Sequence, residues 1–126
     1  MNSTTITAIQ KAMQLASDNR SMEFHHGAIA LKSNRIVGQG INSKRTSWLQ
    51  RVYAKKVGMS SKNWEHAEVA AIRHAKELDT LVVVRVSAKG NLVDSKPCFI
   101  CRKLLEDSGV KHLYYSQDNG IKYERI

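Results

Sequence analysis

An almost unbroken run of β-branched and aliphatic residues, residues 81–86, narrows the choice of fold more than any other segment. A strand with one wet face alternates apolar and polar side chains, so a continuous apolar run is typical of a strand covered on both faces. We therefore expect a central strand here, in a sheet with helices packed on it. At 126 residues, the chain is expected to form a single domain, residues 1–126.

The N-terminal third shows a helical pattern followed by a hairpin pattern. Apolar residues at three- and four-residue spacing predict a helix over about residues 5–17, with Ser3 or Thr4 as its N-cap. Two short apolar runs, at 26–31 and 35–41, then flank a polar pair. This arrangement predicts a β-hairpin of two antiparallel strands.

The middle of the chain is less regular. Residues 42–63 show no clean period, and we expect a loop with some helix there. Asn63 is a plausible N-cap for the alanine-rich segment at 66–77, which is predicted to be a helix.

The C-terminal third combines one helix and two strands. Pro97 is expected to open the helix and Gly109 to end it. Residues 111–115 and 121–126 are predicted strands, and the connection between them is too short for a crossover, so they should be antiparallel. The whole order of elements predicts an α/β fold with a mixed five-stranded sheet and helices packed on it.

The charge of the chain favours an anionic partner. Lys and Arg number 20 and Asp and Glu 11, which gives a net charge of +9. The strongest bias is a basic segment, residues 44–62, which contains no acidic residue. It is predicted to be either a solvated loop or a surface that binds nucleic acid, since three aromatic residues that could stack on unpaired bases lie in or beside it: Trp48, Tyr53 and Trp64.

Several classes of protein are not expected. No apolar run approaches the roughly 20 residues of a membrane span, and the first thirty residues lack a secretory signal pattern, so we expect a cytoplasmic protein without a membrane partner. Two cysteines are too few for a disulfide framework. Their C-x-x-C spacing indicates a metal site or a redox pair.

Two short motifs carry reactive side chains: His66-Ala67-Glu68 and Pro97-Cys98-Phe99-Ile100-Cys101. Two thiolates and one imidazole can hold zinc and leave its fourth position for water, as a catalytic site requires. On an ideal helix, His66 and Glu68 would point about 200° apart, so they can share a site only if His66 stands at the helix end. The alternatives are a structural zinc site, which needs a fourth protein ligand, and a redox pair, which does not explain His66 and Glu68.

The H-x-E and P-C-x-x-C pattern is the signature of zinc-dependent nucleobase deaminases, and the chain resembles the cytidine deaminase superfamily. Phe24-His25-His26-Gly27-Ala28 is similar to the family's F-x-V-G-A entry to the first strand. Gly40-Ile41-Asn42 is similar to the G-x-N that closes the second. The resemblance covers about residues 5–126 and implies a three-layer α/β/α sandwich.

The resemblance also implies roles for individual residues. It implies a Zn²⁺ ion held by three ligands, His66, Cys98 and Cys101, with Glu68 as the proton shuttle. It implies three substrate contacts: Asn42 to the sugar or base, the Ala67 backbone N–H to the base carbonyl, and Phe24 to the ring face. The implied reaction converts cytosine to uracil with release of ammonia.

The substrate class is less constrained than the chemistry. His66, where free-cytidine deaminases usually have Cys, resembles the deoxycytidylate and polynucleotide branches, whereas the short turn before the last strand departs from the deoxycytidylate type. We expect a cytosine nucleotide or nucleoside, with deoxycytidylate favoured and its phosphate near Lys44 and Arg45. The alternatives are a deaminase of cytosine or adenine in single-stranded DNA or RNA, and a non-catalytic zinc-stabilised binding module. A homo-oligomer is also expected from the relatives.

Overall fold

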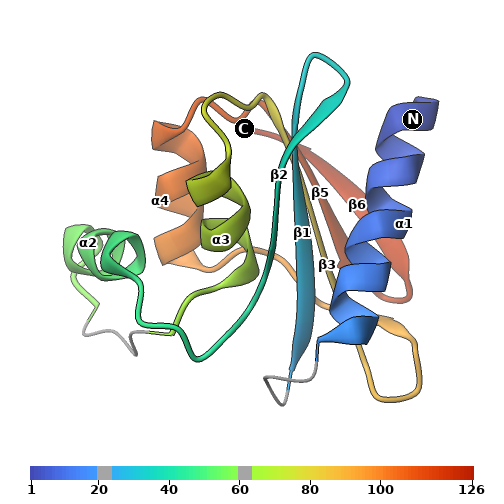
Figure 1. The fold of residues 1–126 in the computed structure, drawn as a ribbon, viewed down its shortest axis with the longest axis horizontal. Helices are drawn as coiled ribbons and strands as arrows, with labels where there is room; N and C mark the ends of the chain where they lie inside the picture. The colour runs from blue at the N-terminus through green and yellow to red at the C-terminus, as the bar shows by residue number, and fades with distance from the viewer. Residues whose placement is uncertain (20–23, 60–63) are drawn as a thin grey trace.

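The computed structural model describes residues 1–19, 24–59 and 64–126. A mixed sheet with the strand order β2-β1-β3-β5-β6 forms its middle layer, and the short β4 pairs with β3 as a sixth strand. Helix α1 covers one face of the sheet, and α2, α3 and α4 lie on the other (Figure 1). In chain order, the elements are α1 (Ser3–Asp18), β1 (His25–Lys32), β2 (Arg35–Ile41), α2 (Trp48–Lys56), α3 (Ala67–His74), β3 (Thr80–Val86), β4 (Leu92–Val93), α4 (Phe99–Asp107), β5 (His112–Gln117) and β6 (Gly120–Arg125).

The predicted central strand is β3, which pairs with β1 on one side and with β5 on the other. Leu81 and Val83 contribute to the core beneath α3 and α4, whereas Val82 and Val84 pack with α1. The continuous apolar run thus serves two cores, one on each face of the sheet.

Glycines let the helices approach the sheet closely. A Cβ on Gly27 would lie 2.2 Å from the Ala12 carbonyl oxygen of α1, and one on Gly40 would lie 2.5 Å from the Ala70 Cβ of α3. Both contacts are shorter than packed atoms allow, so a side chain at either position would force the helix away from the sheet.

Both predicted hairpins form. β1 and β2 are antiparallel, and the residues between them, Ser33 and Asn34, have φ values of 49° and 63°. β5 and β6 are also antiparallel, and Asp118 and Asn119 between them have φ values of 51° and 59°. Two consecutive left-handed residues are typical of the type I′ turn that matches strand twist.

The structure corrects the predicted sheet and the first helix. The sheet has six strands instead of the predicted five. The sixth, β4, was not predicted because its two residues are too few to show any period in the sequence. α1 begins at Ser3 and is capped by Asn2, whose Oδ1 accepts a hydrogen bond from the Thr5 N–H at 2.8 Å. The predicted caps, Ser3 and Thr4, lie inside the helix.

The other two predicted helix starts also differ. α3 begins at Ala67, with His66 in the N-cap position, and it ends at His74, three residues before the predicted end. The predicted cap Asn63 lies outside the described residues. α4 begins at Phe99, so Cys98 is its N-cap and does not belong to its first turn. None of the described helices has both the length and the apolar character that a membrane crossing requires.

Candidate active site

The N-terminal ends of α3 and α4 bring the two reactive motifs together. His66 and Cys98 both occupy N-cap positions with extended backbone, and neither side chain caps its own helix. The His66 Nδ1 lies 3.2 Å from the Cys101 Sγ and 3.8 Å from the Cys98 Sγ. His66 precedes the helix and Glu68 lies in its first turn. This is the arrangement expected from the sequence if His66 and Glu68 share one site.

These three side chains fit a zinc ion. Their ligand atoms all lie within 4.8 Å of one another. Tetrahedral zinc with N and S bonds of about 2.0 and 2.3 Å places its ligands about 3.5 Å apart, between the two measured N–S distances. Within the described residues, the group has these three members, so it suits a metal whose fourth position takes water or substrate.

The side chains of the cluster themselves favour the thiolate form of Cys98. A hydrogen bond from the Cys101 thiol, together with His66, lowers the pKa of Cys98 to about 3. The same Cys98 contact and burial raise the pKa of Cys101 well above its usual value. A thiolate at a helix N-terminus is further stabilised by the helix dipole, and thiolate is the form that binds zinc.

Glu68 lies beside this cluster with a buried carboxyl group. Its side chain is 4% exposed, and its Oε1 has no hydrogen-bond partner among the described residues. Burial raises the pKa of the carboxyl above its ordinary value. With His66 and Cys98, Glu68 lines a cleft of about 290 Å³. A buried carboxyl group with one free oxygen in a cleft is typical of a group that exchanges protons with a ligand.

The sheet supplies the opposite wall of the cleft. In the register of β1 and β3, His26 lies opposite Arg85, and both face the same side as Ala28 and Val83, which pack in the core beneath α3. Both residues line the cleft. Burial, Arg85 and His66 lower the pKa of His26 to about 4, so its imidazole is neutral at pH 7. Its Nε2 is buried and has no partner among the described residues.

Asn42 and Phe24 also line the cleft. Asn42 is buried, donates from its Nδ2 to the Phe24 carbonyl oxygen at 2.7 Å, and accepts at its Oδ1 from the His26 N–H at 3.0 Å. Its Oδ1 also accepts from the Asn19 Nδ2 at 2.7 Å. The Phe24 ring is half exposed and lies beneath the Arg85 guanidinium, 4.4 Å from ring centroid to Cζ.

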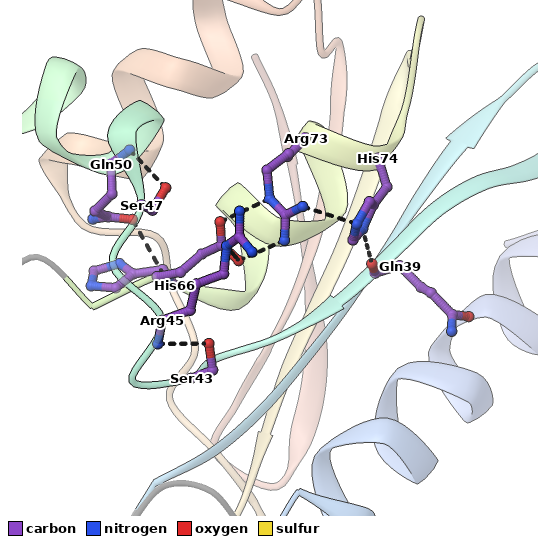
Figure 2. Close-up of polar contacts among 9 residues, drawn as sticks. Gln39, Ser43, Arg45, Ser47, Gln50, His66, Arg73 and His74 are labelled. Atoms are coloured by element: carbon purple, nitrogen blue, oxygen red, sulfur yellow. Dashed lines mark hydrogen bonds and ion pairs between the residues drawn. The ribbon is translucent and has the colours of Figure 1, made fainter.

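A polar network surrounds the start of α3 and holds the His66 backbone (Figure 2). The Oε1 of Gln50, a fully buried residue, accepts a hydrogen bond from the His66 backbone N–H at 3.3 Å. The neighbouring Glu65 is 2% exposed and receives two hydrogen bonds from Arg73, at 2.9 and 3.0 Å. The start of α3 is therefore held by a side-chain acceptor and a buried ion pair.

Comparison with known families decides what this site belongs to. The family model described as the cytidine and deoxycytidylate deaminase zinc-binding region matches residues 2–117. The chain belongs to this deaminase family. Its members are zinc-dependent hydrolases that deaminate cytosine compounds, so the predicted family, enzyme class and metal are confirmed.

Solved structures confirm the predicted deaminase fold at low sequence identity. The cytidine deaminase from Mycobacterium tuberculosis is 21% identical with a TM-score of 0.62, covering 96% of this chain and 89% of that one. The dCMP deaminase from the cyanophage S-TIM5 is 20% identical with a TM-score of 0.63, covering 91% and 84%. The cytidine deaminase from Burkholderia pseudomallei is 14% identical with a TM-score of 0.67, covering 99% and 93%. A comparison with curated proteins gives no significant match.

The structure places the two predicted phosphate ligands of this deaminase outside the cleft lining. The Arg45 Nε lies 3.9 Å from the Glu65 Oε1, beside the Arg73 pair (Figure 2). The Lys44 Nζ lies 5.6 Å from the centroid of the Trp64 ring. Trp64 lines the cleft, whereas Lys44 does not.

The aromatic residues of the basic segment have different surroundings. Tyr53 is buried in the core beneath α4, where its hydroxyl donates to the Asp107 Oδ2 at 2.9 Å, so it cannot stack on a base. Trp48 is 75% exposed. Lys62 lies outside the described residues.

Two residues of the cleft wall, His26 and Arg85, were not predicted from the sequence. The signal for Arg85 was its place as the one charged residue in the apolar run at 81–86. The signal for His26 was its place where the family motif F-x-V-G-A has valine.

Proposed function

We propose that this chain hydrolyses the amino group of a cytosine nucleotide or nucleoside, with deoxycytidylate preferred. His66, Cys98 and Cys101 hold the zinc ion, and Glu68 moves the proton. The observation that carries the proposal is the buried Glu68 carboxyl, whose Oε1 has no partner among the described residues, beside a three-donor cluster at the cleft.

The chain's own groups account for the proton transfers. When bound, the zinc ion lowers the pKa of water from about 15.7 towards about 7. The Glu68 carboxylate accepts the proton of the attacking water, and its conjugate acid delivers that proton to the leaving amino nitrogen. Because burial raises its pKa, the carboxyl can hold the proton between the two steps. Water and cytosine give uracil and ammonia.

The walls of the cleft suggest how the base is held. Phe24 offers an aromatic face at the entrance, and Ala67, the first residue of α3, offers its backbone N–H at the helix N-terminus. Asn42 contributes both by contact with the sugar or base and by fixing the Phe24 backbone. A cleft of about 290 Å³ lies at the lower end of the roughly 300–1,000 Å³ that is usual for small-molecule sites.

A single-stranded nucleic acid is the second candidate substrate. The observation that favours it is the exposed Trp48 ring in the basic segment 44–62, where an aromatic face beside cations suits unpaired bases. Homo-oligomer formation, a cytoplasmic location and a single-domain organisation stay predictions from the sequence.

A glutamine substitution tests the proposed role of Glu68. The zinc-loaded enzyme and Glu68→Gln are assayed for ammonia release from deoxycytidine, deoxycytidylate and a deoxycytidine-containing oligonucleotide. We expect Glu68→Gln to keep its zinc and to lose about 10²- to 10⁴-fold in kcat, the usual contribution of a general acid and base. The matched control is Glu77→Gln at an exposed position, which should leave the rate unchanged. A full rate in zinc-loaded Glu68→Gln would contradict the proposal.

A further inference from the structure

Arg85 occupies a position where a charged residue is costly. The other five residues at 81–86 are buried and apolar, and Arg85 itself is half-buried between β1 and β4, opposite His26 and Val93. Among the described residues, no acidic side chain pairs with its guanidinium, although five other cations form ion pairs. An unpaired, partly buried guanidinium is unfavourable unless it gains a partner on binding.

The orientation of Arg85 suits an anion with several oxygens. The Arg85 Cζ lies over the Phe24 ring, 4.4 Å from the ring centroid, and an aromatic ring takes none of the hydrogen bonds that the guanidinium N–H groups can donate. These N–H groups form a rigid fork that matches the oxygens of phosphate or carboxylate. The ring contact therefore holds an anion-binding group in the cleft wall.

The cleft holds a second cation and three acidic groups. Lys96, which is exposed, lines the same cleft. The carboxylate of Asp94 accepts from the Lys96 backbone N–H at 2.9 Å and from the Gln117 Nε2 at 3.5 Å. Glu65 is neutralised by Arg73, and Glu68 lies beside the metal ligands. Among the described residues, neither Arg85 nor Lys96 forms an ion pair, although the charge of Lys96 contributes to lowering the pKa of Glu124.

We propose that Arg85, assisted by Lys96, binds the phosphate of a nucleoside monophosphate substrate, so that the cleft selects nucleotides over nucleosides. This inference rests on the proposed function and names its substrate class. It transfers the phosphate contact from Lys44 and Arg45, which do not line the cleft, to two cations that do.

The test compares one substrate with and without the phosphate. The zinc-loaded wild type, Arg85→Gln and Arg85→Lys are assayed with deoxycytidylate and deoxycytidine. Arg85→Gln should lower kcat/KM for deoxycytidylate by about 10- to 100-fold, mainly through KM, because a charge-assisted hydrogen bond is lost. The kcat/KM for deoxycytidine should stay within about twofold of the wild-type value, because this substrate has no phosphate for Arg85 to bind. Arg85→Lys keeps the charge but loses the fork, so its loss should be smaller.

The matched control is Arg35→Gln, which changes another strand arginine that is exposed and lies outside the cleft. This variant should leave kcat/KM unchanged for both substrates. Binding of the product gives a second readout that does not depend on turnover: deoxyuridylate should bind the wild type more tightly than Arg85→Gln, whereas deoxyuridine should not distinguish them. Zinc content and far-UV circular dichroism establish that each variant is folded.

The outcomes separate this inference from the proposed function. Equal losses for both substrates in Arg85→Gln would make Arg85 a structural residue and overturn the inference. Equal kcat/KM values for both substrates in the wild type would also overturn it, while deamination itself stood. A higher kcat/KM for the oligonucleotide than for deoxycytidylate would overturn the assignment to a terminal phosphate. No ammonia from any cytosine compound would refute the proposed function.

Discussion

The buried ion pair behind the metal ligands provides a quantitative test of how the site is supported. Arg73 donates to both carboxylate oxygens of Glu65, a residue that is 2% exposed and directly precedes His66. The other nearby cation, Arg45, lies 3.9 Å away with a side chain that is 58% exposed. Arg73→Ala therefore leaves a buried carboxylate with one distant and well-hydrated partner.

The expected loss of stability follows from that geometry. Removing one partner of a fully buried pair costs about 3–5 kcal/mol. Because the Arg73 side chain is 32% exposed and Arg45 remains, we expect a smaller loss of about 2–3 kcal/mol in the free energy of unfolding. With a urea m-value of about 2 kcal/mol/M, the unfolding midpoint should fall by about 1–1.5 M.

Urea unfolding followed by far-UV circular dichroism measures this loss, at one fixed concentration of free zinc because bound zinc also stabilises the fold. The matched control is Arg102→Ala, which breaks the partly exposed pair with Glu124 and should cost less than about 1 kcal/mol. Glu65→Gln in the Arg73→Ala background should recover part of the loss, since a buried amide costs less than a buried charge. Equal midpoint shifts in Arg73→Ala and Arg102→Ala would refute the reasoning.

Two further predictions concern packing and protonation. Gly27→Ala should lower the thermal midpoint by an amount equivalent to about 1–3 kcal/mol, because its Cβ would lie 2.2 Å from the Ala12 carbonyl oxygen, whereas Gly120→Ala, with its nearest atom at 3.8 Å, should have little effect. The depressed pKa of His26 means that the unfolded chain takes up its proton first as pH falls, so the stability from neutral His26 is complete above about pH 6.5 and is lost towards about pH 4. His26→Val should flatten the change in unfolding free energy between these two pH values, by about 3 kcal/mol at most; an unchanged slope would assign it to other groups.

The sequence predicted those parts of the fold that depend on local patterns. The apolar run at 81–86 identified the central strand, and the two polar turns identified both hairpins. The two-residue β4 and the starts of the helices were missed or misplaced. β4 exists because the chain after β3 folds back onto Arg85 and Val86, a long-range pairing that leaves no periodic trace in two residues.

The chemistry of the site was predictable for the same reason. The H-x-E and C-x-x-C spacings place their side chains at two helix starts, so the donor set follows from short segments once those segments meet. Lys44 and Arg45 were assigned to a phosphate because they follow Asn42 in sequence. Neither residue lines the cleft itself: Arg45 contacts the buried Glu65 and Lys44 lies over Trp64, and it is these two neighbours that line it.

The cleft wall depends on long-range geometry that no local pattern contains. His26 and Arg85 become neighbours through the register of β1 and β3, and both line the cleft. One local sign was nevertheless present. A strand that is apolar on both faces has no structural use for a guanidinium, so the single arginine in such a strand indicates that one face opens onto a ligand at that residue. Arg85→Gln should therefore stabilise the free protein and weaken deoxycytidylate binding, because the same guanidinium costs stability when free and binds the substrate.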